Sequence, residues 1–82
     1  MSVLTEISEA LQKGRAKQIK VLVPQALEEG IPAQQILEEG LLAGMGIIGQ
    51  KFKNNEVFVP EVLVAARAMN TGAELLKPAL TD

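Results

Sequence analysis

The chain has 82 residues, enough for one small domain, and its net charge of -2 with scattered Lys and Arg excludes a basic surface for nucleic acid. It has no histidine and no cysteine, which excludes disulfides, imidazole or thiolate metal sites and an imidazole base, so we expect no catalysis by the chain itself. No apolar stretch approaches the roughly 20 residues that span a bilayer, and no signal-peptide pattern opens the chain, so we expect a cytoplasmic protein without membrane contact.

The first predicted helix follows Ser2, whose hydroxyl suits an N-cap, and it ends at Gly14. Leu4, Ile7 and Leu11 fall on one face at helical spacing. The pattern therefore predicts a short amphipathic helix that packs through this face.

The second predicted helix runs from about Arg15 to Glu29, with Gly30 as its C-cap. Its buried stripe is expected to contain Ala16, Ile19, Leu22, Val23, Ala26 and Leu27. Pro24 lies inside this segment and removes the hydrogen bond to the carbonyl of Lys20. We expect the helix to bend at the proline rather than to open into a loop.

A third helix of about five turns is predicted to begin at Pro32, which suits a first helical turn. Its apolar stripe is Ile36, Leu37, Leu41, Gly44, Ile48 and Phe52. The helix also contains Gly40, Gly44, Gly46 and Gly49, each of which costs up to about 1 kcal/mol relative to alanine. Close packing of a neighbouring backbone is the favoured reason, and a flat ligand pressed against the helix is the alternative.

The fourth predicted helix has Pro60 at its first position and ends at Pro78. Its packing face is expected to contain Val62, Ala66, Met69, Ala73 and Leu76. Four helices with short connections predict an all-α fold, an antiparallel four-helix bundle that occupies residues 1–82 as a single domain.

The connection between the third and fourth helices, FKNNEVFVPE at residues 52–61, contains both aromatic residues of the chain. Asn54 and Asn55 favour a tight turn, because asparagine tolerates positive φ. Residues 57–59 are apolar where a solvated loop would be polar, so something must cover them. We favour a hydrophobic plug tucked under the bundle, and the alternative is an apolar lid for a partner or cofactor.

Other candidate sites are weak. Met45 and Met69 are interpreted as core fillers rather than cofactor contacts. The adjacent carboxylates at residues 28–29 and 38–39 point in different directions on a helix, so they do not form a general acid/base pair.

The segments EEGLLAGMGIIGQKF, NNEVFVPE, AARAMNTG and LLKP together resemble the N-terminal helical cap domain of cobalamin-binding corrinoid proteins. A similar cap precedes the cobalamin-binding domain in methionine synthase and in the corrinoid proteins of methanol and methylamine methyltransferase systems. The resemblance covers almost the whole chain. Its most specific part is Gly-Met, then Gly-x-x-Phe, then an F-[LV]-P-E turn into a helix.

The resemblance implies that the bundle covers the upper face of methylcobalamin and shields the cobalt-bound methyl group during cobalamin-dependent methyl transfer. Carried over by motif position, the cofactor contacts fall on Phe52, Val59 and Val62. Val59 stands where the family pattern often has leucine, and Phe58 would support the packing. The cap would swing aside when a methyltransferase partner needs to reach cobalt.

The main departure from the family is length. The Rossmann-like cobalamin-binding domain, with its Asp-x-His-x-x-Gly motif, is absent from this chain, so we expect no cobalamin on the chain alone. Leu76 to Asp82 resembles the start of a linker toward that domain. Pro24 and Gly46 also depart from the pattern.

The expected partners are the cobalamin-binding domain of the same protein and its cognate methyltransferases. Without that domain the apolar lid would face water, so we also expect a homodimer of the isolated chain. The alternative function is a free-standing helical module that dimerises or binds a partner helix through the same surface.

Overall fold

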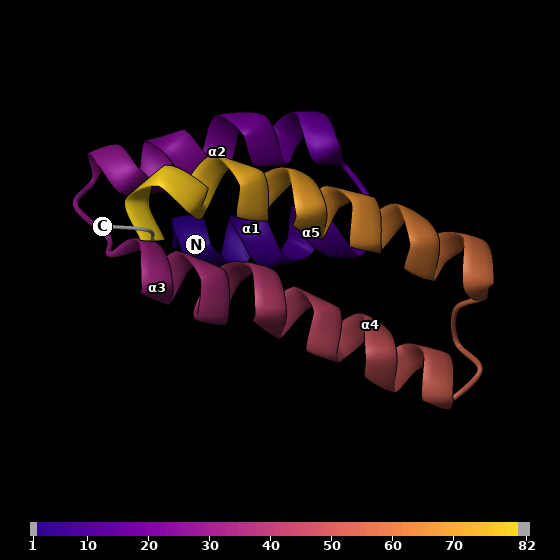
Figure 1. The fold of residues 1–82 in the computed structure, drawn as a ribbon. Coiled ribbons are helices and arrows are strands. Elements are labelled where there is room, and N and C mark those ends of the chain that lie inside the picture. Colours follow the sequence, from indigo (N-terminus) through magenta and orange to yellow (C-terminus); the bar gives the residue numbers. More distant parts are fainter. Residues whose placement is uncertain (1, 81–82) are drawn as a thin grey trace.

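The computed structural model describes residues 2–80, which form helices joined by short turns, with no strand in that range (Figure 1). The elements are α1 (Val3–Gln12), α2 (Ala16–Glu28), α3 (Ala33–Gln35), the π-helix η1 (Ile36–Leu42), α4 (Ala43–Lys53) and α5 (Val59–Leu80). Because α3, η1 and α4 follow one another without a break, they form one long rod. The all-α four-helix bundle predicted from the sequence is therefore confirmed. Of the predicted linker from Leu76 to Asp82, residues 76–80 belong to α5 instead, while Thr81 and Asp82 lie outside the described residues.

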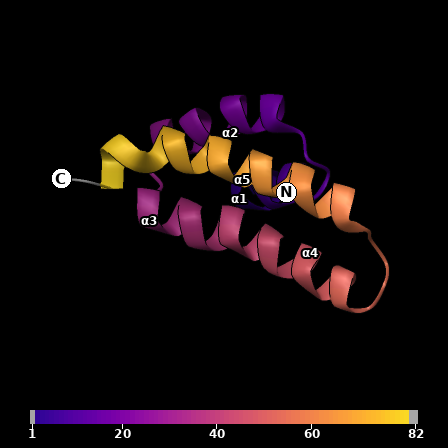
Figure 2. The ribbon, with the colours of Figure 1, turned by 45° about the vertical axis from the view of Figure 1, so that its right-hand side comes forward.

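The four rods enclose one core in a molecule of 38 × 24 × 19 Å. Helix α1 packs against α2, η1 and α4, while α5 lies along α2 and also contacts η1 and α4 (Figures 1 and 2). In both views α4 and α5 diverge toward residues 54–58, which connect them at one end of the molecule. The start of α5 is therefore placed at an outer corner of the bundle.

The core is aliphatic. Its largest fully buried side chains are Ile7, Leu11, Ile19, Val23, Ile36, Leu41, Ile48 and Leu76. They come from the stripes predicted for all four helices, and no aromatic side chain is among them. Met45 and Met69 are partly buried against this core, as predicted for core fillers.

Helix α1 approaches the long rod closely at two glycines. A Cβ on Gly44 would lie 2.9 Å from the carbonyl oxygen of Ser8, and a Cβ on Gly40 would lie 3.0 Å from Cγ2 of Ile7. The contact with the Ser8 backbone is closer than real Cβ atoms come, so alanine at Gly44 would push α1 away from the rod, and alanine at Gly40 would force the Ile7 side chain to shift. The packing interpretation of these two glycines is confirmed.

All three turns between rods use the same local geometry. Gly14, Gly30 and Asn55 have φ values of 68°, 85° and 63°, in the left-handed region. In each turn the backbone N–H of the following residue donates a hydrogen bond to a carbonyl in the last turn of the preceding helix. The pairs are Arg15 to Ala10, Ile31 to Ala26, and Glu56 to Lys51. This is the Schellman arrangement, which satisfies carbonyls at the helix end. The predicted ends at the two glycines and the asparagine turn are confirmed.

Side chains cap two helix starts. The Ser2 hydroxyl accepts a hydrogen bond from the Thr5 N–H at 3.2 Å, as predicted for α1. The Glu61 carboxylate accepts one from the Phe58 N–H at 2.9 Å, where α5 begins. Both bonds satisfy donors that the first helical turn leaves without a partner.

Two prolines lie inside helices, and the sequence predicted only one of these outcomes. Pro24 does not split α2, which is continuous from Ala16 to Glu28. The prediction that Pro78 ends the last helix is wrong, because α5 continues to Leu80. Both prolines are exposed, and so are Lys20 and Glu74, whose carbonyls lose their helical partner. At exposed positions a carbonyl without a helical partner can bind water, which lowers the cost of a missing hydrogen bond.

The packing face of α5 also differs from the prediction. Its buried residues are Ala65, Ala68, Gly72 and Leu76, whereas Ala66 and Ala73 of the predicted stripe are only partly buried. Helix α5 lies against three other rods, and its smallest side chains are placed where those rods approach it. The face therefore follows side-chain size as well as hydrophobicity.

Candidate functional site

Four exposed large apolar side chains lie in or beside the connection between α4 and α5. Phe52 lies in the last turn of α4, Phe58 precedes α5, Val59 is its first residue, and Leu63 follows one turn later. Their exposed fractions are 46%, 68%, 54% and 56%, respectively. We call these four residues and Val62 the apolar corner.

The structure places the three residues predicted as cofactor contacts in this corner. Phe52 and Val59 are exposed on either side of the turn, and Val62 is partly buried against the core. Phe58, directly before Val59, and Leu63, one turn after it, are exposed as well. Leu63 was not singled out from the sequence, although its position four residues after Val59 puts it on the same side of a helix.

The predicted plug is wrong. Phe58 and Val59 are exposed and Val57 is only partly buried, so residues 57–59 do not tuck under the bundle. The left-handed Asn55 ends α4, and only residues 56–58 remain before α5 begins. A connection this short, across the end where the two helices diverge, cannot fold back beneath them.

The corner offers apolar contact and no metal ligand. The chain has no histidine or cysteine, and no group of three or more acidic side chains that could hold a metal occurs within residues 2–80. The nearby Glu61 carboxylate is bound to the Phe58 N–H, so it serves as a helix cap. Arranged in this way, the corner can exclude water from a surface placed against it, but it cannot ligate a metal.

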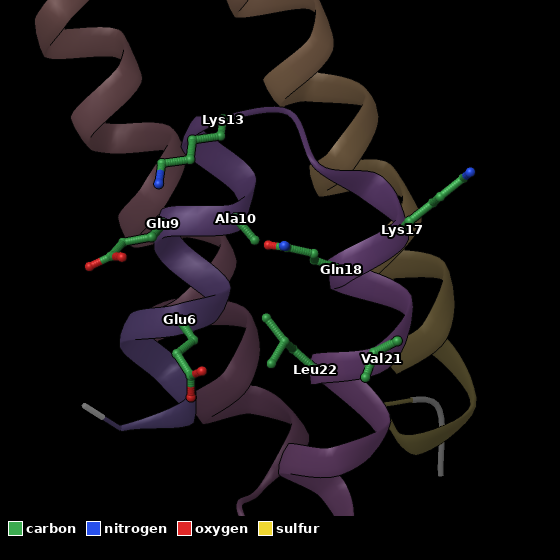
Figure 3. Close-up of a pocket in the computed structure, with 8 residues that line it drawn as sticks. All are labelled: Glu6, Glu9, Ala10, Lys13, Lys17, Gln18, Val21 and Leu22. Carbon is green, nitrogen blue, oxygen red and sulfur yellow. The ribbon is translucent and has the colours of Figure 1, made fainter.

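A separate groove of about 550 Å³ lies between α1 and α2 (Figure 3). Ala10, Gln18 and Leu22 point into the space between the helices, whereas Glu9 and Lys17 point away from it. The lining combines scattered charges with a few apolar groups and holds no pair of nucleophile and base. We do not regard it as the functional site, because none of the residues in the predicted cofactor surface lines it.

None of the helices formed by the described residues is long and apolar enough to cross a membrane.

Comparisons with known proteins place the whole bundle in one family. The family model described as "B12 binding domain" matches residues 3–77. Monomethylamine corrinoid protein 2 of Methanosarcina acetivorans is 44% identical over 59 residues, which are 72% of this chain and 27% of that protein. The trimethylamine corrinoid protein of Methanosarcina barkeri is 34% identical over 76 residues, which are 93% of this chain and 35% of that protein.

A solved structure agrees with these matches. The monomethylamine corrinoid protein of Methanosarcina barkeri superposes with a TM-score of 0.86 and 33% identity, over 89% of this chain and 34% of that one. The matched segments thus span about a third or less of these corrinoid proteins, 27% and 35% of the two relatives named above. The resemblance noted in the sequence is confirmed, and the chain belongs to the B12 binding domain family of corrinoid proteins.

Proposed function

We propose that this chain is the helical cap of a corrinoid protein, where it covers the upper face of cobalamin and shields the cobalt-bound methyl group. The observation that carries the proposal is the exposure of Phe52 and Val59 beside Val62 in one corner of a bundle of this family. Exposed apolar surface costs about 25 cal/mol per Å² in water, which favours a surface that is covered in use.

The residues of the corner fit the role of a cover and not that of a ligand. Their side chains are hydrocarbon, so they suit the face of a flat ring that carries a methyl group. They supply no atom that could bind cobalt from either side. A cobalamin-binding domain outside this chain would therefore hold the cofactor, and the chain would close over it.

Cobalamin supplies the chemistry of methyl transfer when it is bound. The part of this chain is to keep water away. Val62 packs against the core and so fixes the start of α5, while Phe52 and Val59 extend outward from the two helices. A dry surrounding suppresses side reactions of a reactive group. The chain contributes no catalytic residue, and the cognate methyltransferases would act on the cofactor once the cap has moved away.

A chimera tests the proposal. In it, residues 1–82 replace the matched segment of the Methanosarcina barkeri monomethylamine corrinoid protein, and the product is loaded with methylcobalamin. Phe52→Ala should hasten photolysis of the bound cofactor, followed by its visible absorption, without reducing the amount bound. Val21→Ala is the matched control, because Val21 is 65% exposed but lies on α2. An unchanged photolysis rate for Phe52→Ala would rule out shielding by this residue.

Self-association is the second candidate role of the same surface. The apolar corner is exposed in the single chain, and patches of this kind commonly mediate contacts between proteins. In an isolated chain the corner of one copy would cover that of another, and the module would form a homodimer.

A further inference from the structure

The seven glycines of the chain fall into three groups according to their backbone conformation and to what a Cβ would meet. Gly14 and Gly30 have positive φ, and Gly14 is also crowded. At three further glycines a Cβ would lie within 3.0 Å of another atom: Gly40, Gly44 and Gly72. For Gly46 and Gly49, no atom lies within 4 Å of the Cβ position. Nothing in the described part of the chain requires glycine at these two positions.

Both of these glycines lie inside α4, where they reduce stability. A glycine in a helix interior costs up to about 1 kcal/mol relative to alanine, because it loses more backbone freedom on folding. The other physical use of a glycine with ordinary φ is to let a surface come close to the backbone. The described residues provide no such surface at either position, so a surface that used one of these glycines would come from outside the described residues.

The two positions differ in their relation to the apolar corner. Gly49 precedes Phe52 by three residues, so the two are neighbours on one side of the helix, about 60° apart around its axis. Gly46 precedes Phe52 by six residues and lies about 120° away from it around the axis. A ligand seated on Phe52 would extend over Gly49 but not over Gly46.

We infer that Gly49 is a contact residue of the cofactor-facing surface, where its bare backbone lets the ring of cobalamin approach α4 beside Phe52. The inference rests on the proposed function and deepens it, because it names the point of closest approach between the helix and the ring. Gly46 has no such contact.

Substitution by alanine separates this role from a structural one. At Gly49 the added methyl group would hold the ring away from α4 and leave a gap beside Phe52. The same methyl group would stabilise the helix, since it meets no atom of the chain. Gly49→Ala should therefore raise the stability of the fold and at the same time weaken the shielding of the cofactor. A glycine with a purely structural role would not produce these two opposite effects.

The experiment compares Gly49→Ala, Gly46→Ala and Phe52→Ala in the methylcobalamin-loaded chimera described above, with photolysis rate as the readout. The urea midpoint of the 82-residue chain, followed by circular dichroism, is measured for the two glycine variants. Both glycine variants should have a higher midpoint than the parent chain. Gly49→Ala and Phe52→Ala should hasten photolysis, whereas Gly46→Ala should leave it unchanged.

The outcomes separate the two proposals. If Phe52→Ala hastens photolysis but Gly49→Ala does not, the role of Gly49 is wrong and the proposed function stands. If neither variant changes photolysis, the proposed function fails, and the inference fails with it. A lower midpoint for Gly49→Ala, or faster photolysis for Gly46→Ala as well, would also overturn the inference, because the glycine would then be structural or its position unspecific.

Discussion

Gly72 of α5 lies so close to Leu41 of η1 that a Cβ on the glycine would come within 2.8 Å of both terminal methyl carbons of the leucine. Leu41 is completely buried, and Cγ2 of Ile19 would lie 3.2 Å from the same Cβ. The glycine thus permits α5 and the long rod to share a layer of the core with no space between them.

Gly72→Ala should destabilise the chain. Forcing a methyl group into a filled core costs about 1–3 kcal/mol, which exceeds the gain of up to about 1 kcal/mol in helix propensity. Urea unfolding followed by circular dichroism measures the difference. Gly46→Ala is the control, since its methyl group would meet nothing and should raise the midpoint. Equal stabilisation by both substitutions would show that the core has room beside Leu41.

Glu61→Ala should destabilise the start of α5. The carboxylate accepts the hydrogen bond from the Phe58 N–H, and loss of a helix cap typically costs about 1 kcal/mol. Glu61→Gln retains an acceptor and should lose less. Glu74→Ala, in the exposed middle of the same helix, serves as the control and should change the free energy of unfolding little. A loss for Glu74→Ala as large as that for Glu61→Ala would argue against capping.

Asn55→Ala should cost about 1–2 kcal/mol, because alanine is strained at a φ of 63°. Asn55→Gly should keep or raise the stability, since glycine adopts this conformation without strain. The neighbouring Asn54 has a φ of -88°, so Asn54→Ala is a matched control with little expected effect. Thermal or urea unfolding of the three variants gives the comparison. Equal costs at residues 54 and 55 would contradict the role assigned to the turn.

Phe58→Ser should weaken self-association of the isolated chain. Phe58 is 68% exposed, and it precedes α5 at a position that suits serine as an N-cap, so the fold should tolerate the change. Sedimentation velocity over a range of concentrations would report the dimer. Val21→Ser removes a side chain of similar exposure on α2 and should leave association unchanged. A parent chain that stays monomeric at the highest concentration would refute the homodimer.

The helix ends were predictable because each depends on a few adjacent residues. Ser2, Gly14, Gly30 and Asn55 act through their own side chains or backbone freedom, and the structure places all four as expected. The core stripes of the first three rods followed from spacing, except that Phe52, the last member of the third stripe, is exposed and lies outside the core. The long rod was foreseen as one helix, but its π-helical turns from Ile36 to Leu42 were not, because no local signal distinguishes them from α-helix.

The errors arise where the outcome depends on distant parts of the chain. The sequence near Pro78 contains a helix breaker, yet exposure of Glu74 makes the proline tolerable, and exposure is a tertiary property. The buried face of α5 includes Gly72, whose close approach to Leu41 on the long rod joins residues far apart in the sequence. Residues 57–59 are apolar whether they are a plug or a surface, so only the divergence of α4 and α5 could decide between the two. The three residues of the candidate site came from motif position rather than from any physical pattern.

Val59 and Leu80 stand at opposite ends of α5, a helix of 22 residues. At 1.5 Å per residue the helix is a lever arm of about 33 Å, so a pivot of about 20° at the Leu80 end would carry the Val59 end through about 11 Å. A displacement of this size exceeds the thickness of any single side chain. If the whole bundle turned about that end as one body, small torsional adjustments far from Phe52 would move the entire corner while the four rods keep their mutual packing.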